Sequence, residues 1–528
     1  MSNLSEEEKE NRFYKRTVLF VVIIGTFMAI LDSSIVNIAL PKMMAVYNVS
    51  QEDAKWIITA YTLTLGAVIP LTGYLSNKFG TKNVYIYSLA FFTLGSLLCG
   101  VSSSNNMMIF SRILQALGGG MIMPVSMSIL YDVIPPQERG VALGIWGIAA
   151  MAAPSIGPTL GGYIIEYLDW RLIFTLNIPL GIMGVFLSWI LLKPSKKTEI
   201  KKFDMIGFIT STIGVVSLLY VFGEGEVDWN DLKNILLLIV GIFNLVMFVI
   251  NELMIEEPLL DLRILKYMTF SMSIVISSLL NMALFGVVFV MPLFFQNLMG
   301  FSAMKTGLIM LPSAISTGIM MPVGGKLFNK YGAKPLLIVG ITIMAVTTYL
   351  LSGITTDTPI SYMMLLLAIR GIGLGLGMMP VTTEGLNAVP HNQVPAASAL
   401  SNTIKQIASS ISVTMISTIL ATQQKVSYAK MIENTNNFNI NYNSVINTVQ
   451  GYYMSIGYGL SDAGVITKTI ISSIIQKQAF LDGVNKSLVI SAIISVVCLI
   501  SGLFMGKKKK DGNEEENNGE VEMSAFVE

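Results

Sequence analysis

The sequence predicts an all-α integral membrane protein with fourteen transmembrane helices, and three observations support this prediction. Hydrophobic residues make up 53% of the 528-residue chain and charged residues only 13%, about half the charged share usual in soluble proteins. Apolar runs of roughly 20 residues, the length that crosses a bilayer, recur along the chain. Two motifs in the first half return in the second half. We therefore expect two pseudo-symmetric six-helix bundles with two inserted linking helices.

Each expected span is an apolar run bounded by polar or charged residues. The spans lie at about 17–40, 56–75, 84–102, 107–130, 140–165, 171–192, 205–223, 234–252, 268–295, 305–325, 335–352, 360–381, 396–422 and 486–506. The expected organisation is an N-terminal arm at 1–16, a first bundle at 17–192, a linker with the inserted helices at 193–252, a second bundle at 253–506 and a disordered tail at 507–528. The second bundle includes a long loop at 423–485, read as a helical hairpin on the outer membrane surface or as a functional lid.

The distribution of basic residues predicts the orientation of the chain in the cell membrane. Lys9, Arg12, Lys15 and Arg16 precede the first span, which has no small-residue cleavage signature and is expected to be retained. With the N-terminus inside, most lysines and arginines outside the spans fall on the inner side. The short outer segments hold only Lys42, Lys55, Arg171, Lys233 and Lys305. Because basic residues favour the cytoplasmic side, we expect both termini to be cytoplasmic.

Composition also excludes several classes of function. Lys plus Arg (34) nearly equals Asp plus Glu (33), so no basic excess is available to bind nucleic acid. One histidine, His391, and two cysteines in apolar runs, Cys99 and Cys498, exclude disulfide frameworks and zinc sites built from His and Cys. The glycines at 371–377 follow no strand and lack a Gly-Lys-Ser/Thr ending, so no nucleotide site is expected. We expect no cofactor and an ion gradient as the energy source.

An internal repeat places the inserted helices. The sequence NKFG at 77–80 returns as NKYG at 329–332, an offset of 252 residues. Arg112 and the glycines after it are matched by Arg370 and its glycines, at an offset of 258 residues. Spans 2 and 4 therefore correspond to spans 10 and 12, a step of eight. Spans 7 and 8 must lie between two six-helix halves.

Five motifs in order resemble those of the major facilitator superfamily, and within it the fourteen-helix drug:proton antiporters. GYLSNKFGTK at 73–82 resembles the signature between helices 2 and 3, RILQALGGG at 112–120 the helix-4 motif, and APSIGPTLGG at 153–162 the helix-5 motif associated with antiporters. LDSSIVNIALP at 31–41 and the segment at 170–181 resemble the fourteen-helix branch. The signature's usual aspartate is Asn77 here, and its second basic position is Thr81. The usual charge clasp between the inner helix ends therefore lacks its acid.

The resemblance implies a carrier that alternates between inward-open and outward-open states and exports lipophilic, often cationic, drugs or antibiotics in exchange for protons. It also implies gating by the two glycine-containing motifs, while ordinary close packing is the alternative role. The expected gating residues are Gly73, Lys78 and Gly80 in the first motif and Pro154, Gly157, Pro158, Gly161 and Gly162 in the helix-5 motif.

Asp32 and Arg112 are the candidate proton-coupling residues. Asp32 lies ~12 Å from the outer end of its span and Arg112 ~8 Å from the outer end of its own, at 1.5 Å per residue. Intramembrane carboxylates are costly and commonly functional. Burial disfavours the charged form of a carboxyl group and a guanidinium favours it, so a change in either contact can load or release a proton. The alternative is a permanent ion pair that locks helices 1 and 4 together.

Substrate binding is expected from polar and adaptable side chains that could face the central cavity. Ser33 and Asn37, at i and i+4, extend the polar stripe of helix 1. Methionine thioethers repack around varied ligands, and Glu384 lies at the inner mouth where a cation would first be attracted. The candidates are Ser33, Asn37, Met282, Gln296, Met378 and Glu384.

Other functions stay open at this point. The same antiport mechanism could export one physiological metabolite, although uptake with a proton is disfavoured by the helix-5 motif. A membrane-embedded transferase would need clusters of His, Asp or Glu that this chain lacks. A passive channel would need a ring of like charges or a filter segment. The expected partners are therefore small-molecule drugs, protons and membrane lipids.

Overall fold

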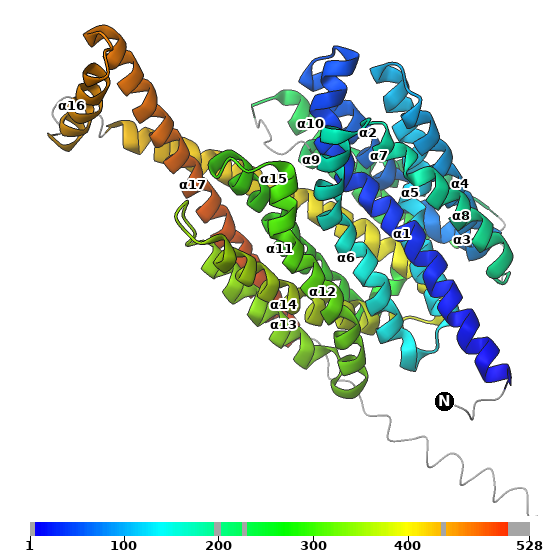
Figure 1. Ribbon diagram of the computed structural model, residues 1–528. Coiled ribbons are helices and arrows are strands. Elements are labelled where there is room, and N and C mark those ends of the chain that lie inside the picture. Colours follow the sequence, from blue (N-terminus) through cyan, green and yellow to red (C-terminus); the bar gives the residue numbers. More distant parts are fainter. Residues whose placement is uncertain (1–5, 195–201, 224–229, 434–439, 505–528) are drawn as a thin grey trace, which may run out of the picture.

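The computed structural model describes residues 6–194, 202–223, 230–433 and 440–504, and these residues are almost entirely helical, with no strand. Two helical bundles lie side by side (Figure 1). The first contains α1 (Glu6–Tyr47), α2 (Gln51–Val68), α3 (Leu71–Phe79), α4 (Thr81–Gly100), α5 (Asn105–Val133), α6 (Pro136–Tyr167), α7 (Leu172–Thr175) and α8 (Asn177–Leu191). The inserted helices are α9 (Met205–Gly223) and α10 (Leu232–Met254). The second bundle contains η1 (Leu262–Lys266), α11 (Met268–Leu293), η2 (Phe294–Leu298), α12 (Ala303–Tyr331), α13 (Ala333–Leu351), α14 (Ile360–Asn387), η3 (His391–Gln393), α15 (Val394–Glu433), α16 (Ile440–Ser455) and α17 (Leu460–Leu503).

The predicted fold class is confirmed, whereas the helix count stays a prediction. Among the described residues, 12 helices are long and apolar enough to cross a membrane, and α2 with α3 forms one further candidate bent by 56°. The bend falls at Pro70, which explains it because proline removes a helix hydrogen bond. The predicted fifth span coincides with α6, part of whose side chains lie outside the described ones.

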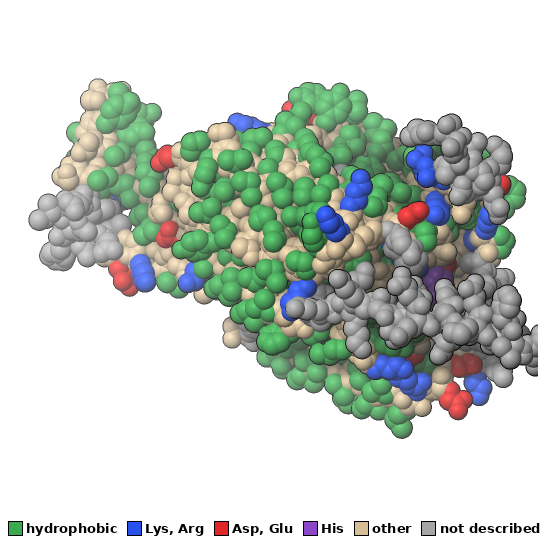
Figure 2. All heavy atoms as spheres, turned by 90° about the horizontal axis from the view of Figure 1, so that it is seen from below, with side chains coloured by type: hydrophobic (Ala, Val, Ile, Leu, Met, Phe, Trp, Pro, Cys, Tyr) green, Lys and Arg blue, Asp and Glu red, His purple; other side chains and the backbone are tan. Residues whose placement is uncertain are grey.

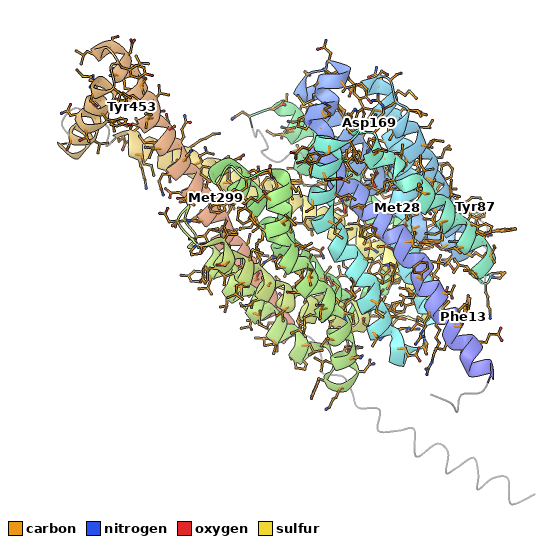
Figure 3. The ribbon with its side chains drawn as sticks, viewed as in Figure 1. Phe13, Met28, Tyr87, Asp169, Met299 and Tyr453 are labelled. Carbon is orange, nitrogen blue, oxygen red and sulfur yellow. The ribbon has the colours of Figure 1, made fainter. Side chains whose placement is uncertain are left out.

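The start of α1 and the end of α17 lie at the same end of the molecule (Figure 1). We call this the terminal end and the opposite one the far end. Phe13 lies at the terminal end, and Asp169 and Met299 lie toward the far end of the two bundles (Figure 3). The tail at 507–528, predicted to be disordered, lies outside the described residues.

The outer surface of the bundles is apolar, as contact with lipid requires. Figure 2 shows hydrophobic side chains spread widely over the described part of the surface seen from below. On α10, Leu232, Phe243 and Met254 are 67%, 62% and 79% exposed. Such exposure would be unfavourable in water, so the surface supports the membrane location that composition predicts.

The repeat is visible in the backbone at two glycines. Gly80 ends α3 and begins α4 with φ +86°, and Gly332 ends α12 and begins α13 with φ +77°. Other L-residues are strained at positive φ, so both positions of the repeat need glycine.

The hydrophobic cores show where the two bundles are joined. At the terminal end a single core contains buried side chains of both bundles, among them Tyr131, Trp146, Met379 and Leu400. At the far end each bundle has a core of its own. The first-bundle core includes Ile35, Met43 and Phe174, and the second-bundle core includes Val290, Phe294 and Leu367. The bundles are thus packed together at the terminal end and are less joined at the far end.

The predicted outer loop at 423–485 is helical where it is described. Two of its helical segments are continuous with membrane spans, because α15 and α17 extend from the spans into this region. α15 has 40 residues and α17 has 44, or ~60 and ~66 Å at 1.5 Å per residue. Both exceed the ~30 Å hydrocarbon thickness. Figure 1 shows α16 at their far ends, clear of the bundles. The separate hairpin expected on the membrane surface is therefore replaced by extensions of α15 and α17, while residues 434–439 lie outside the described ones.

Candidate functional site

Asp32 on α1 and Arg112 on α5 form an ion pair inside the first bundle. Arg112 Nη1 donates to Asp32 Oδ2 at 2.5 Å. The Asp32 side chain is 0% exposed and that of Arg112 is 1% exposed. The contact expected from their depths along two antiparallel helices is thus present. Its part in proton coupling stays a prediction.

Polar side chains complete this cluster: Gln115 on α5, Ser96 on α4 and Asn177 on α8. Gln115 Nε2 donates to Asp32 Oδ1 at 2.8 Å, and Asn177 Nδ2 donates to the same oxygen at 3.0 Å. Gln115 Nε2 also lies 2.7 Å from Ser96 Oγ, and Gln115 Oε1 accepts from Arg112 Nη1 at 2.6 Å. Our sequence analysis missed Gln115 and Asn177. Gln115 follows Arg112 by three residues, one helical turn, and this spacing could have suggested it.

Aromatic rings enclose the guanidinium of Arg112. Its Cζ lies 3.8 Å from the ring centroid of Tyr61 and 5.9 Å from that of Phe174. Both rings are buried, so the cation–π attraction acts with little competing water. Arg112 Nε is buried without a hydrogen-bond partner. The two rings therefore stabilise the positive charge in addition to Asp32. This allows Arg112 to keep its position if Asp32 is neutralised.

The Asp32 carboxyl group connects α1 with two other helices. Its oxygens accept from Arg112 and Gln115 of α5 and from Asn177 of α8. A change in the charge of Asp32 would therefore act on the contact between α1 and α5.

The predicted substrate-binding residues on α1 lie outside this cluster. Ser33 and Asn37 are exposed. Ser33 Oγ donates to Ile30 O at 2.8 Å, and Asn37 Nδ2 donates to Ser33 O at 3.4 Å. Their stripe thus lies beside the buried face that carries Asp32, and its role in binding stays a prediction.

The predicted substrate-binding residues of the second bundle lie at different depths. Gln296 is exposed in η2 at the far end, whereas Glu384 is half-buried near the terminal end of α14. Met282 is half-buried on α11, and Met378 packs against two apolar cores. Their spread gives no support to a single pocket shared by all four, and drug contacts at each residue stay predictions.

In the 73–82 motif, Gly80 occupies a position that needs glycine, and Gly73 lies at a close contact between the bundles. A Cβ at Gly73 would lie 3.1 Å from Cα of Ala396 on α15, so the two bundles approach closely here. Gly80 has the positive φ described above. Lys78 Nζ donates to Tyr74 Oη at 2.9 Å within the same helix. The motif therefore lies at the junction of the bundles, where a gate would act.

The glycines of α6 bring it close to helices of both bundles. A Cβ at Gly157 would lie 2.6 Å from Ser34 Oγ, and one at Gly161 would lie 2.6 Å from Ile35 Cγ1, both on α1. A Cβ at Gly162 would lie 3.5 Å from Met304 N on α12. The close approach predicted for these glycines is present. The side chains of Pro154 and Pro158 lie outside the described ones.

A histidine–carboxylate contact and a hydrogen bond join the bundles at the terminal end. His391 Nε2 lies 3.2 Å from Asp132 Oδ1, and Thr81 Oγ1 lies 3.5 Å from Asp132 Oδ2. Arg139 Nη1 donates to Asn387 Oδ1 at 2.9 Å. Asp132 and His391 thus provide an acid–base contact across the bundles, although the motif's usual aspartate is replaced by Asn77. Sequence reasoning did not identify this clasp.

Arg370 occupies the place in the second bundle that corresponds to Arg112. It is 2% exposed, and its Nη2 donates to Ala283 O at 2.9 Å, while its Nε donates to Thr348 Oγ1 at 3.1 Å. These partners are neutral. The two halves of the repeat therefore differ in their chemistry at this depth.

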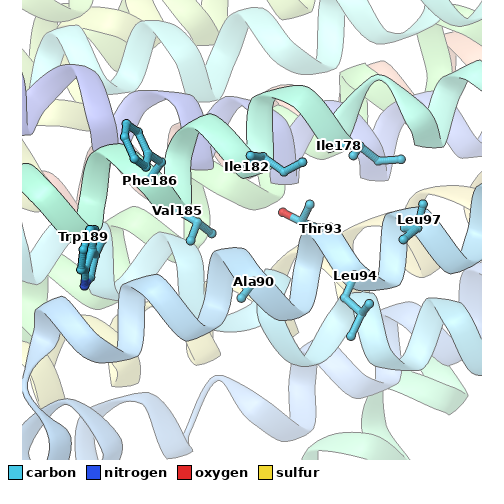
Figure 4. Close-up of a pocket in the computed structure, with 9 residues that line it drawn as sticks. All are labelled: Ala90, Thr93, Leu94, Leu97, Ile178, Ile182, Val185, Phe186 and Trp189. Carbon is cyan, nitrogen blue, oxygen red and sulfur yellow. The ribbon is translucent and has the colours of Figure 1, made fainter.

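A groove of about 540 Å³ lies between α4 and α8 (Figure 4). Its lining is nearly all apolar and includes Leu94, Ile182, Phe186 and Trp189, which are 48%, 59%, 57% and 66% exposed. The groove therefore opens on the outer face of the first bundle, away from the buried Asp32.

Comparisons with known proteins agree with this architecture. The family model described as Major Facilitator Superfamily matches residues 22–413. An uncharacterized MFS-type transporter of Bacillus subtilis, YhcA, is 35% identical over 510 residues, 96% of this chain and 95% of its own. The lincomycin resistance protein LmrB of Bacillus subtilis is 30% identical over 512 residues, covering 96% and 99% of the two chains. The multidrug export protein EmrB of Escherichia coli is 31% identical over 437 residues, covering 82% and 85%.

A solved structure shows the same fold at low sequence identity. The human organic anion transporter MFSD10 superposes with a TM-score of 0.61, at 11% identity, over 92% of this chain and 99% of its own. This likeness supports the arrangement of two helical bundles and carries no information about the substrate.

Proposed function

Because the chain belongs to the major facilitator superfamily, we propose that this membrane transporter exports lipophilic, often cationic, drugs or antibiotics in exchange for protons. Relatives named for lincomycin resistance and multidrug export support the drug-export part of the proposal. The buried Asp32–Arg112 pair is the observation that supports proton coupling. The distribution of basic residues supports a cell-membrane protein with both termini in the cytoplasm.

The proposed coupling begins at Asp32. A proton from outside neutralises its carboxylate, which removes the attraction to Arg112, while Arg112 keeps its charge because a guanidinium does not deprotonate in proteins. Tyr61 and Gln115 retain the guanidinium. Asp32 then keeps only the neutral amide contacts of Gln115 and Asn177, which hold α1 against α5 less strongly than the ion pair does.

Movement of α1 can reach the interface between the bundles through α6. Ser34 and Ile35, next to Asp32 on α1, touch Gly157 and Gly161 of α6. The same helix packs along α12 of the second bundle. This continuous packing supports a link from the protonation of Asp32 to rocking of one bundle against the other.

With cytoplasmic termini, the joined terminal end corresponds to a carrier closed toward the cytoplasm. The single core and the Asp132–His391 clasp support this assignment. A carrier in this state would release its drug outward and receive a proton from the same side. Export in exchange for protons requires that order.

The decisive experiment is drug-dependent proton movement in liposomes that contain the purified chain and its Asp32→Asn variant. With a panel of structurally different dyes and antibiotics, the natural chain should change the internal pH as each substrate is transported, and the variant should not. A variant that transports like the natural chain would assign Asp32 to a permanent ion pair. Activity with one compound alone would favour the export of a single metabolite.

A further inference from the structure

Two carboxyl groups meet at the terminal end of the inserted helices α9 and α10. Asp204 immediately precedes α9, and Glu252 lies in the last turn of α10. They are 4% and 0% exposed. They lie on the inserted pair of helices, whereas Asp32 lies within the first bundle. No role for them follows from the proposed transport cycle.

Backbone and amide donors satisfy three of the four carboxyl oxygens. Asp204 Oδ1 accepts from Gly207 N at 2.8 Å, and Asp204 Oδ2 accepts from Asn251 Nδ2 at 2.8 Å. Glu252 Oε2 accepts from Leu260 N at 3.0 Å. Glu252 Oε1 is buried and has no N–H or O–H donor. An oxygen in this position needs a proton or a cation.

The unsatisfied oxygen of Glu252 faces Asp204. A Cβ built on Gly207 would lie 2.6 Å from Glu252 Oε1 and would also collide with Asp204 Oδ2. Both oxygens therefore lie against one small surface, close enough for a proton on one of them to be shared with the other. Two carboxylates cannot donate to each other, so a hydrogen bond between them requires that one carries a proton.

The surrounding charges do not neutralise this pair. Asp261 lies next to Leu260 and adds negative charge on that side. The nearby cations serve other groups: the guanidinium of Arg263 donates to Leu253 O and Ile255 O, and Lys78 Nζ bonds Tyr74 Oη. Lys202 is exposed, and its backbone N donates to Glu257. Among the described residues, no lysine, arginine or histidine forms an ion pair with Asp204 or Glu252.

We propose that Asp204 and Glu252 bind one shared proton in the folded protein, at a site separate from Asp32. Two like charges this close, buried and uncompensated, disfavour the doubly ionised state. The shared proton connects the start of α9 to the end of α10. Through Leu260 N it also fixes the segment that enters the second bundle.

The test compares the full-length chain with Glu252→Gln in lipid nanodiscs by infrared spectroscopy. At neutral pH the natural chain should show the C=O stretch of a protonated carboxylic acid, shifted by deuterium exchange, and the variant should lack this component. Glu256→Gln is the matched control, because it changes the same residue type at an exposed position four residues away, and it should keep the band. A band that is the same in all three proteins would overturn the proposal.

Thermal unfolding gives a second readout that separates a proton from a bound metal ion. A proton that the folded pair holds more tightly than the unfolded chain stabilises the folded state at low pH, and this contribution falls as the pH rises until the folded pair also loses the proton. The unfolding midpoint of the natural chain should therefore fall with rising pH more than that of Glu252→Gln, which cannot lose that proton. If the midpoint of the natural chain instead rises when sodium replaces choline, and that of the variant does not, the pair binds a cation and the proposal is wrong. If Glu252→Gln does not fold, Asp204→Asn replaces it, because its amide oxygen can still accept from Gly207 N.

Discussion

Arg370 donates to the carbonyl oxygen of Ala283 at the place in the second bundle where Arg112 donates to the carboxylate of Asp32 in the first. Both arginines are buried. The first bundle therefore pairs its arginine with a group that can bind a proton, and the second pairs it with a backbone carbonyl that cannot. The two halves therefore have different roles in the proposed cycle, in which proton exchange takes place in the first bundle.

A double-mutant cycle should show how strongly Asp32 and Arg112 depend on each other. Asp32→Leu alone leaves a buried guanidinium without its counter-ion, and we expect a loss of about 3–5 kcal/mol in the free energy of unfolding. The Asp32→Leu/Arg112→Leu variant removes both charges and should recover most of that loss. Denaturant unfolding of the natural chain, Asp32→Leu, Arg112→Leu and the double variant in the same detergent measures this. A loss in the double variant equal to the sum of the two single losses would mean that the two side chains are not coupled.

Close contact between α6 and α12 should be essential for transport. A Cβ at Gly325 would collide with the backbone carbonyl oxygen of Gly140, and backbone cannot move aside easily. We expect Gly325→Ala to cost about 1–3 kcal/mol in the packed state, and efflux to fall by roughly tenfold. Efflux of a fluorescent substrate, normalised to the amount of protein in the membrane, measures the effect.

The matched control for Gly325 is Gly318→Ala on the same helix. Its new Cβ would lie 3.3 Å from Cγ2 of Ile148, a side-chain methyl group of an exposed residue and not backbone, so efflux should stay within about twofold. Similar losses in both variants would show that α12 simply tolerates no alanine at its glycines.

The clasp between His391 and Asp132 should favour the joined terminal end. The contact crosses from η3 to α5, and a permanent positive charge at position 391 would attract the Asp132 carboxylate. Because the side chains are 60% and 35% exposed, the pair should contribute at most about 1 kcal/mol, a change of a few-fold in rate. Thr81, Arg139 and Asn387 surround the pair.

The matching variants for the clasp are His391→Lys and His391→Gln. The lysine carries a positive charge and should keep the joined state, whereas the glutamine is uncharged and should weaken it, with a change in efflux of at most a few-fold. Efflux of a fluorescent substrate at one fixed pH, normalised to the amount of protein in the membrane, tests this. Equal efflux in both variants would mean that the clasp does not contribute.

Introduced cysteines should reveal the orientation in the membrane. Both natural cysteines, Cys99 and Cys498, are buried, so a polar maleimide should give little background. Lys330→Cys lies near the terminal end of α12, and Lys468→Cys lies on the far extension of α17; both positions are exposed. With cytoplasmic termini, intact cells should be labelled at position 468, and at position 330 only after permeabilisation. The reverse pattern would invert the proposed direction of transport.

The helical fold could be predicted because a single strong constraint determines it. A bilayer requires about 20 apolar residues per span, and that requirement is readable in one sequence. The correspondence between Gly80 and Gly332 could be predicted for a similar reason, because glycine is the residue that readily adopts a backbone conformation with positive φ. The lengths of α15 and α17 were not readable, because beyond the bilayer a polar helix and a polar loop have similar compositions.

The candidate site was predictable only where one rare residue marked it. Asp32 and Arg112 stood out because charges within apolar spans are costly. Gln115 and Asn177, which bind the same carboxylate, are uncharged and resemble other polar residues in the sequence. Glu252 was missed for a different reason. It lies at the edge of its span, where glutamates are commonly solvated, and only the packing of Asp204 and Gly207 shows that it is enclosed.

The single core that holds the bundles together at the terminal end is made largely of aliphatic and aromatic side chains. Apolar association weakens on cooling, because its driving force near room temperature is mainly entropic. At low temperature the carrier therefore spends less time in the state that is closed at the terminal end. The equilibrium between its conformational states then depends on temperature even when substrate and proton concentrations are held constant.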